Sequence, residues 1–339
     1  MSKVTMQDIA DAVSVSRITV WKALSNRPGV SEELRRQIQH TAADLGYRPS
    51  ETAPAGVLQE RTFSVVVSRP ESSAFWMQII HHIAKELALH GIKLMYTYMP
   101  TAYKQGYTLP SSLSPDSVDG LIVLNIYDER LLRMLTQQPL PKVYLDTVPA
   151  VPPDELNGDL VILEGRTRIR QITDRLLREG RKRLGFIGDV DYAQTNYDRY
   201  LGFLDAHSAC HIQVDPALSM TGPIGLRSHY EEISAFLGGL PALPDGFICA
   251  SDFIAHYVWR YLSETGRSRP DGFVLTGFDN NVEYANVAEQ ITTVDVETSM
   301  LGKDLARKLI YRTDYPKAPY EVSYIATKIL YRGRLAEGR

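Results

Sequence analysis

Cysteine and long apolar runs are scarce in this sequence. Its 339 residues include two cysteines, Cys210 and Cys249, so no disulfide framework is implied. No apolar run approaches the roughly 20 residues that a membrane-spanning helix needs, and the first 16 residues lack the apolar core of a secretory signal. We therefore expect a protein of the cytoplasm, with reduced thiols and no membrane partner.

Signatures of catalysis and of metal binding are also missing. The sequence contains no Gly-x-Ser-x-Gly elbow, no Walker loop and no Gly-x-Gly-x-x-Gly motif. His81 and His82 have no partner at metal-ligand spacing, and His207 and His211 flank Cys210 without the further groups that a nucleophile or metal site needs. We expect surface histidines, no catalytic residues, no metal, no cofactor and no enzymatic activity.

Charge is nearly balanced overall but unevenly distributed. The net charge of −3 alone argues against a nucleic-acid partner. Residues 1–50 nevertheless carry seven Lys and Arg against five Asp and Glu, whereas the remainder carries 30 against 35. A mildly basic head on an acidic body is consistent with a DNA-binding module attached to a sensing body. The length suggests two or three domains, and the 44% of hydrophobic residues is ordinary for a globular protein.

N-cap residues mark three short helices within the first 50 residues. Thr5 and Asp8 have the spacing of a capping box, Ser16 is placed to cap a second helix, and Ser31 is placed to cap a third. Gly46 supplies the stop after the third helix. The apolar residues recur at helical spacing and predict three inner faces: Met6, Ile9, Ala10 and Val13; Val20, Ala23 and Leu24; Leu34, Ile38, Ala42 and Leu45.

The very tight turn between the first two helices is typical of a helix-turn-helix. In that unit the second helix enters the major groove of DNA, and its first residues meet the base edges. Arg17, Ile18, Trp21 and Lys22 are predicted to face outward there. Arg17 can pair with guanine, and Ile18 can pack on a thymine methyl group. The alternative is a three-helix bundle with a merely solvated outer face, which an exposed apolar and aromatic face disfavours.

Residues 3–50 resemble the N-terminal module of the LacI/GalR family of bacterial repressors. The resemblance implies that Arg17, Ile18 and Lys22 read bases. Trp21 stands where a small polar residue is common, and it either contacts the sugar-phosphate backbone or packs on the hinge. The residues that the resemblance assigns to phosphate contacts are Thr5, Ser16, Thr19 and Asn26. The motifs that carry it are Val4-Thr5, Asp8-Ile9-Ala10, Val15-Ser16, Thr19-Val20, Ala23-Leu24, Val30-Ser31 and Leu45-Gly46-Tyr47-x-Pro49.

Two positions depart from the family pattern in ways that matter physically. The family usually has Ala-Gly where this chain has Val13-Ser14, and a left-handed backbone at Ser14 would cost on the order of 1 kcal/mol. In the hinge, Gly56 occupies the position of the leucine that the family inserts into the minor groove. A helix could still begin at Pro54 and present Leu58 as the wedge. The alternative is a flexible linker, with less dependence on a central DNA kink.

From residue 63 onward, short apolar runs alternate with amphipathic helical stretches. This alternation is typical of parallel sheets covered on both faces. About 280 residues exceed one sheet, so we expect an α/β body of two doubly wound lobes, with a ligand in the crevice beyond the carboxyl ends of the strands. The predicted strands are 63–68, 92–98, 119–124, 142–146, 183–188, 246–250 and 272–277. The predicted helices are 75–90, 128–137, 164–179, 197–208, 228–238, 252–265 and 297–312.

The body resembles the sensing body of the same family, which is similar to the periplasmic sugar-binding proteins. The resemblance implies a head at 1–49, a hinge at 50–61, an N-terminal lobe of 62–159 and 291–320, and a C-terminal lobe of 160–290 and 321–339, with three crossings between the lobes. The motifs are Asp119-Gly-Leu-Ile, Arg199-x-x-Gly-Phe, Cys-Ala-Ser-Asp252-x-x-Ala, Gly-Phe-Asp279-Asn and Ile-Thr-Thr-Val at 291–294.

The same motif positions imply the main polar ligands of an effector. Asp279 and Arg199 are implied to bind it, and Asp146 lies at the end of a predicted strand, facing the crevice. Carboxylates, amides and a fixed arginine suit the hydroxyl groups of a sugar. Ser251 stands where the family commonly has asparagine, so one amide is lost. We expect Asp252 to cap its helix rather than to contact the ligand.

Phe75 and Trp76 match the aromatic pair that follows the first strand of the body in the family. Both rings could stack on a sugar, and Trp76 could instead belong to the core. The last eight residues carry no apolar heptads long enough for a tetramerising coil, so we expect a dimer.

Together these observations predict a DNA-binding transcriptional regulator that acts as a repressor. A homodimer would present two heads to a near-palindromic operator, and a small molecule in the crevice, a sugar first of all, would set the affinity for DNA. The first alternative is the same regulator controlled by a purine, a nucleoside or a phosphoprotein partner. The remote alternative is a soluble sugar-binding protein or an enzyme with an unrelated helical head.

Overall fold

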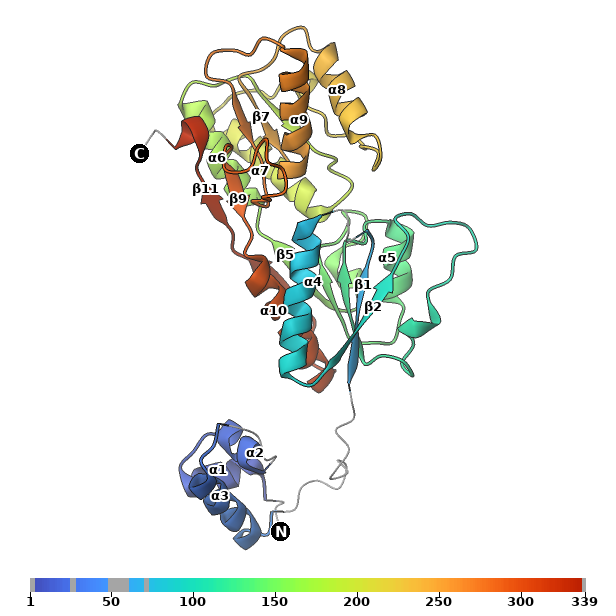
Figure 1. Ribbon diagram of the computed structural model, residues 1–339, viewed down its shortest axis with the longest axis vertical. Coiled ribbons are helices and arrows are strands. Elements are labelled where there is room, and N and C mark those ends of the chain that lie inside the picture. The colour runs from blue at the N-terminus through green and yellow to red at the C-terminus, as the bar shows by residue number, and fades with distance from the viewer. Residues whose placement is uncertain (1–3, 25–28, 48–60, 70–72, 337–339) are drawn as a thin grey trace. The chain divides into compact units, whose positions relative to one another are not determined.

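The computed structural model describes residues 4–24, 29–47, 61–69 and 73–336 (Figure 1). The chain divides into two compact units, Met1–Gln59 and Glu60–Arg339, which are called the head and the body below. Within these described ranges, every helix is too short or too polar to cross a membrane.

The described residues of the head form three helices, α1 (Met6–Val13), α2 (Arg17–Leu24) and α3 (Glu32–Asp44). The predicted capping box is present: the Thr5 amide donates to Asp8 Oδ2 over 2.7 Å, and the Asp8 amide donates to Thr5 Oγ1. Ser16 Oγ accepts from the Thr19 amide, and Ser31 caps α3. The three inner faces meet in one small core of Ile9, Ala10, Val20, Ala23, Ile38 and Ala42.

The burial of two side chains, Leu45 and Arg35, differs from the predicted pattern of α3. Leu45, predicted to be buried, is 40% exposed. The helix ends at Asp44, and Leu45 is the C-cap residue before Gly46 turns the chain at a φ of +69°, so Leu45 has left the core-facing stripe. Arg35 is buried instead, and its Nη1 donates to the carbonyls of Lys22 and Ala23. It thereby satisfies the carboxyl-terminal carbonyls of α2 and ties α2 to α3.

Ser14 ends α1 in the left-handed conformation, with φ 57° and ψ 43°, and its amide donates to the Ala10 and Asp11 carbonyls. A Cβ atom is strained in this region, whereas glycine enters it freely. We predict that Ser14→Gly stabilises the head by about 0.5–1 kcal/mol. Hydrogen exchange of the α1 and α2 amides would measure the change. Ser14→Ala keeps the Cβ atom, and an equal gain in both variants would show that relief of left-handed strain is not the cause.

The N-terminal lobe of the body is a six-stranded parallel sheet in the order β10-β5-β4-β3-β1-β2. Its strands are β1 (Thr62–Val67), β2 (Lys93–Tyr98), β3 (Gly120–Leu124), β4 (Lys142–Leu145), β5 (Asp159–Leu163) and β10 (Val322–Ile325). Helices α4 (Ala74–Leu89) and α10 (Thr298–Asp314) cover one face, and α5 (Glu129–Thr136) helps to cover the other. Side chains alternate along each strand, so Val65 and Val67 pack toward α4 while Val66 packs toward α5.

The C-terminal lobe contains a three-stranded parallel sheet of β6 (Leu184–Ile187), β7 (Gly246–Cys249) and β8 (Val274–Thr276). Helices α6 (Arg166–Arg178) and α7 (Gln194–Ala209) cover one face, and α8 (His229–Gly239) and α9 (Asp252–Thr265) cover the other. Strand β9 (Thr293–Asp295) adjoins β8 through the Thr276–Thr292 bridge and pairs with antiparallel β11 (Lys328–Leu330). Short 3-10 helices occupy Ser111–Leu113, Pro153–Glu155, Pro216–Leu218 and Gly333–Leu335.

The expected α/β architecture is confirmed, and the predicted helices and strands of the body are present with small shifts at their ends. The assignment of strands to lobes needs correction. Residues 160–163 and 322–325, expected in the C-terminal lobe, form β5 and β10 of the N-terminal sheet. Residues 293–295, expected in the N-terminal lobe, form β9 beside β8. An apolar run predicts a buried strand but not the sheet in which the strand finds its hydrogen bonds.

A buried ion pair holds β10 beside β5. Arg312 Nε and Nη2 donate to the two oxygens of Asp159 over 2.8 and 2.6 Å, and both side chains are buried. Asp159 Oδ1 also accepts from the Glu321 amide, directly before β10 begins. Since the two residues are 153 positions apart, no local sequence pattern reveals this pair.

Three segments connect the lobes, at 163–166, 295–298 and 325–328. Two of them are joined directly, because Thr327 Oγ1 donates to the Glu164 carbonyl over 2.7 Å. In parallel sheets the carboxyl ends of the strands lie at one edge, and the segments that follow these ends form the surface on which ligands bind.

Candidate functional site

A cleft of about 360 Å³ is lined by residues of both lobes. Four of its lining residues have a positive φ angle although they are not glycine: Arg69, Asn125, Asp146 and Asp279. They follow β1, β3, β4 and β8, at the carboxyl ends of the strands. Non-glycine residues persist in this region only where surrounding structure holds them, and such strain gathers at functional sites. The predicted crevice is therefore the candidate ligand site.

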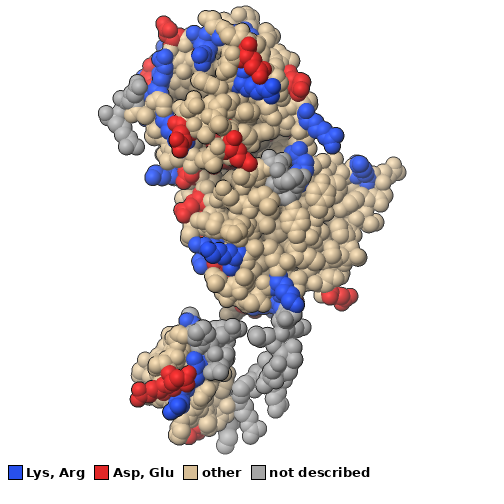
Figure 2. Space-filling view, viewed as in Figure 1, with Lys and Arg blue, Asp and Glu red and all other residues tan. Residues whose placement is uncertain are grey.

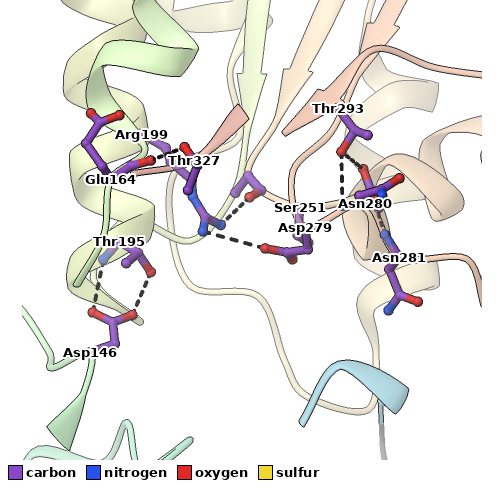
Figure 3. A network of polar contacts seen from close by, with 12 residues as sticks. Asp146, Glu164, Thr195, Arg199, Ser251, Asp279, Asn280, Asn281, Thr293 and Thr327 are labelled. Carbon is purple, nitrogen blue, oxygen red and sulfur yellow. Dashed lines mark hydrogen bonds and ion pairs between the residues drawn. The ribbon is translucent and has the colours of Figure 1, made fainter. Parts of the chain in front are cut away.

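Arg199, on α7, is the central cation of the cleft. It is 4% exposed, its Nη1 donates to the Ala250 carbonyl over 2.6 Å, and its guanidinium carbon lies 3.6 Å from the centroid of the Phe278 ring. Nη2 stands 3.7 Å from Asp279 Oδ1, beyond ordinary hydrogen-bonding distance. Nε has no hydrogen-bond partner among the described residues. Figure 3 shows the guanidinium pointing toward Asp279. The group is fixed, and Nη2, which faces Asp279, retains donor capacity for a ligand.

Asp279 faces Arg199 across this gap. Burial raises the pKa of its carboxyl group, and the charge of Arg199 opposes that rise. The Asp279 side chain is half-buried, with 22% of its surface exposed, and the nearest Arg199 nitrogen stands 3.7 Å away. A ligand hydroxyl would supply a closer hydrogen-bond donor. The structure thus brings Asp279 and Arg199 together, as the resemblance implies.

Asp146 lines the cleft as expected, but its carboxylate is already engaged. Oδ2 accepts from Thr195 Oγ1 over 2.6 Å and from the Tyr127 hydroxyl over 3.3 Å. Oδ1 accepts from the amides of Thr147 and Thr195. Burial raises its pKa, and the hydrogen bond from Thr195 is the largest effect opposing that rise. Because Asp146 follows β4 and Thr195 begins α7, this carboxylate joins the two lobes (Figure 3).

The expectation that Asp252 caps α9 is wrong. Ser251 is the N-cap, with Oγ accepting from the Ile254 amide, and Ser251 also lines the cleft. Asp252 is 3% exposed and accepts from Thr293 Oγ1 and the Asn281 amide, over 2.8 Å each. It therefore anchors the loop that carries Asp279. Sequence reasoning could not separate these adjacent residues, since either one can cap a helix.

Aromatic side chains line much of the cleft. Phe75 and Trp76 both line it at the start of α4, with ring centroids 5.2 Å apart and planes at 83°. The ring centroids of Tyr127 of the N-terminal lobe and Tyr192 of the C-terminal lobe are 4.6 Å apart. Sequence reasoning missed this second pair, although both tyrosines follow strand ends. It also missed the aromatic residues His229, Phe253 and Tyr284, and the polar residues Arg69, Ser73, Asn125, Asp189, Asn196 and Asn281.

One of the histidines is not a surface residue. His207 is 2% exposed, its Nδ1 lies 2.9 Å from the Phe203 carbonyl, and its ring packs 4.3 Å from the Phe203 ring. Burial lowers its pKa and favours the neutral imidazole. Across the described part of the chain, no three His, Cys, Asp or Glu side chains are grouped so that they could hold a metal ion.

In the head, the structure places Arg17, Ile18, Trp21 and Lys22 on α2. Ser16 Oγ and Thr19 Oγ1 are 2.8 Å apart at its start, next to the exposed turn. The side chains of Arg17, Ile18 and Trp21 lie outside the described residues, as do Asn26 and Leu58 entirely. The DNA contacts and the two alternatives for the hinge therefore stay predictions.

Asp252 makes the stability of the body dependent on pH. Burial, with a smaller effect of Asp279, raises the pKa of Asp252 from 3.8 to about 7. The folded protein then holds this proton at a higher pH than the unfolded chain does. Its stabilising contribution is complete below about pH 4 and is lost as the pH rises through about 7.

We predict that the melting temperature falls as the pH rises from about 5 to about 8, and that Asp252→Asn flattens this fall. Asp146 and Asp279 also have raised pKa values, so part of the slope remains. Thermal unfolding over a pH series measures it, with Asp271→Asn, an exposed carboxylate of the same lobe, as control. Equal slopes in the two variants would rule Asp252 out as a source.

Two family models match the chain. One, described as bacterial regulatory proteins of the lacI family, matches residues 5–50 and so spans the three helices of the head. The other, described as a periplasmic binding protein-like domain, matches residues 173–333 of the body.

Known proteins match nearly the whole chain. The HTH-type transcriptional regulator RegA of Clostridium saccharobutylicum is 26% identical over 316 residues, covering 90% of this chain and 91% of RegA. A solved complex of the transcriptional regulator CelR with cellobiose has a TM-score of 0.68 at 23% identity, covering 97% of this chain and 99% of that one. The lac repressor dimer bound to operator and the anti-inducer ONPF has a TM-score of 0.63 at 17% identity, covering 98% of each chain. The two structural matches show a shared fold.

Proposed function

The chain belongs to the LacI family of bacterial regulatory proteins, and from this premise we propose that it is a sequence-specific DNA-binding repressor whose operator affinity is set by a sugar bound between the lobes. The observation that carries the proposal is the Arg199–Asp279 pair. A fixed cation faces a half-buried carboxylate across a gap of 3.7 Å, in a cleft that is also lined by aromatic rings.

The DNA half of the proposal rests on the head. Helix α2 begins directly after the Ser14–Ser16 turn, and its first residues are Arg17 and Ile18. Ser16 and Thr19 bring two hydroxyl groups to the same end, where phosphate oxygens can accept from them. In this proposal Arg17, Ile18 and Lys22 read bases, whereas Thr5, Ser16, Thr19 and Asn26 contact phosphates. Trp21 and Leu58 remain candidate contacts to the DNA backbone and to the minor groove.

We predict that Arg17→Ala weakens binding to the chain's own upstream DNA by about tenfold or more, because one bidentate base contact is worth about 1–3 kcal/mol. Lys22→Ala should have an effect of similar size. Gel shift or anisotropy titration at fixed salt measures both, since affinity for DNA depends on ionic strength. Arg36→Ala, an exposed arginine of α3, is the charge-matched control. If all three variants bind as the unmodified chain does, the chain is not a regulator of the proposed kind.

The sugar half rests on the chemistry of the cleft. Carboxylate, guanidinium and amide groups orient hydroxyl groups, and aromatic faces pack against the apolar face of a sugar ring. Asp279, Arg199 and Asn281 supply the first kind of group, and Phe75 and Trp76 supply the second. The cleft volume of about 360 Å³ falls within the range of small-molecule sites. The cellobiose held by CelR, which has the same fold, is in keeping with a sugar.

We predict that a thermal-shift screen of mono- and disaccharides, nucleosides and sugar phosphates finds its largest shifts among the sugars, because a ligand bound only to the folded state raises the melting temperature. Asp279→Asn and Arg199→Gln should each reduce affinity for the best sugar by about tenfold or more. Asp205→Asn, a surface carboxylate on the same helix as Arg199, is the control. If only a purine or a nucleoside stabilises the protein, the effector is not a sugar, and the alternative of a purine- or nucleoside-controlled regulator takes its place.

The proposed dimer fits the surface of the N-terminal lobe. Helix α4 and strand β2 pack against each other and expose four large apolar side chains, Met77, Leu89, Tyr96 and Tyr98, which are 45–75% exposed. Figure 2 shows that the surface around these two elements is mostly uncharged. Aromatic residues and methionine are enriched, and charges depleted, in the cores of protein interfaces. Two heads joined in this way would meet a near-palindromic operator, and lobe movement on ligand binding would alter their spacing.

A further inference from the structure

A second cavity lies beside α6 and the connection from β10 to β11, two regions that adjoin in Figure 1. It is an open groove of about 530 Å³, lined by Arg168, Gln171, Asp174, Thr327, Lys328, Ile329 and Tyr331. None of these residues lines the cleft that contains Asp279. The groove is therefore separate from the proposed sugar site.

The lining of this groove favours an anion. Lys328 is exposed, and Arg168 donates from Nη1 to Gln171 over 3.1 Å. Arg168 Nε forms a long ion pair of 3.7 Å with a Glu164 oxygen, and the Arg168 side chain is 28% exposed. The acidic residue of the lining, Asp174, is offset by Arg178 at 2.9 Å and also accepts from the Cys210 thiol. Two cations thus retain capacity for a negatively charged group.

The groove also has a flat apolar side. The guanidinium carbon of Arg175 lies 4.6 Å from the centroid of the Tyr331 ring, and Arg175 is held in turn by Glu179. The ring of Tyr331 is therefore fixed in place, with Ile329 beside it in the lining. We propose that this groove binds a small organic anion, whose phosphate or carboxylate group pairs with Arg168 and Lys328 while its ring packs on Tyr331 and Ile329.

The groove adjoins the segments that connect the lobes, so a ligand bound there could affect the relative orientation of the lobes. Lys328 directly follows Thr327, whose hydroxyl donates to the Glu164 carbonyl (Figure 3). Arg168 is in the first turn of α6 and forms its long ion pair with Glu164. An anion held by Arg168 and Lys328 would therefore bridge two of the three segments that connect the lobes. It would act as a second effector by restraining the movement of the lobes. This regulatory consequence rests on the proposed function, whereas the binding of the anion does not rest on it.

Calorimetric titration of the full chain at low salt, with phenyl phosphate, benzoate and inorganic phosphate, tests the binding. We expect phenyl phosphate to bind more tightly than inorganic phosphate, and Arg168→Gln and Lys328→Gln each to weaken it by about tenfold. Tyr331→Leu should remove the preference for phenyl phosphate over inorganic phosphate. The benzoate titration shows whether a carboxylate can replace the phosphate group.

Two control variants distinguish binding in this groove from binding elsewhere on the protein. Arg170→Gln removes an exposed charge from the same helix outside the groove and should leave binding unchanged. Asp279→Asn should also leave it unchanged, because that residue belongs to the other cleft. Absence of saturable binding, or equal losses in the Arg168, Lys328 and Arg170 variants, would overturn the proposal.

The regulatory consequence has its own readout. Saturating phenyl phosphate should shift the sugar affinity of the unmodified chain by about fivefold or more, in either direction, and should not shift that of Arg168→Gln. An unchanged sugar affinity would reject the coupling of the two sites. Failure of DNA and sugar binding with anion binding intact would refute the proposed function and not the groove, and the reverse result would refute the groove alone.

Discussion

The hydrogen bonds between Asp146 and Thr195 are the contact on which the ligand cleft depends. The buried carboxylate of Asp146, at the end of β4, accepts hydrogen bonds from both the hydroxyl group and the backbone amide of Thr195, in the first turn of α7. A carboxylate that is buried without partners is expensive, and one that accepts several hydrogen bonds is stable and directional. The position of α7 relative to the N-terminal sheet follows from this contact, and so does the position of Arg199, one turn further along the same helix. The cleft is thus organised by a residue whose place in the sequence suggests only a contact with the ligand.

The polar groups in and beside the cleft fall into two sets: those whose hydrogen bonds are already satisfied within the protein, and those with unused hydrogen-bonding capacity. Asp146 and Asp252 are satisfied, and they hold the two lobes and the Asp279 loop in place. Arg199 and Asp279 face each other at 3.7 Å with unused hydrogen-bonding capacity. Such a division lets a preformed site bind a polar ligand with little rearrangement, since the satisfied groups carry the geometry and the unsatisfied groups gain from the ligand.

The connections between the lobes offer a place where a second signal could act. Each lobe has its own sheet, and one hydrophobic cluster includes buried residues of both lobes. Their relative orientation is carried by this packing, by three short segments and by the contacts across the cleft. A ligand in the cleft lies between the lobes, and the groove at Arg168 and Lys328 adjoins two of the three segments that connect them. Both sites would bias the same movement, which is the physical condition for coupling between them.

The sequence by itself determined the local structure: the capping box at Thr5, the three helices of the head, and the alternation of buried strands and amphipathic helices, because caps and periodicity are encoded by neighbouring residues. Motif positions also located Arg199 and Asp279. Tertiary structure alone decided that β5 and β10 join the N-terminal sheet, that Tyr127 meets Tyr192, that His207 is buried, and that Asp146 bonds to Thr195. Periodicity tells how buried a residue is but not which distant residue buries it. These pairings join residues up to 162 positions apart, so they exist only once the chain has folded.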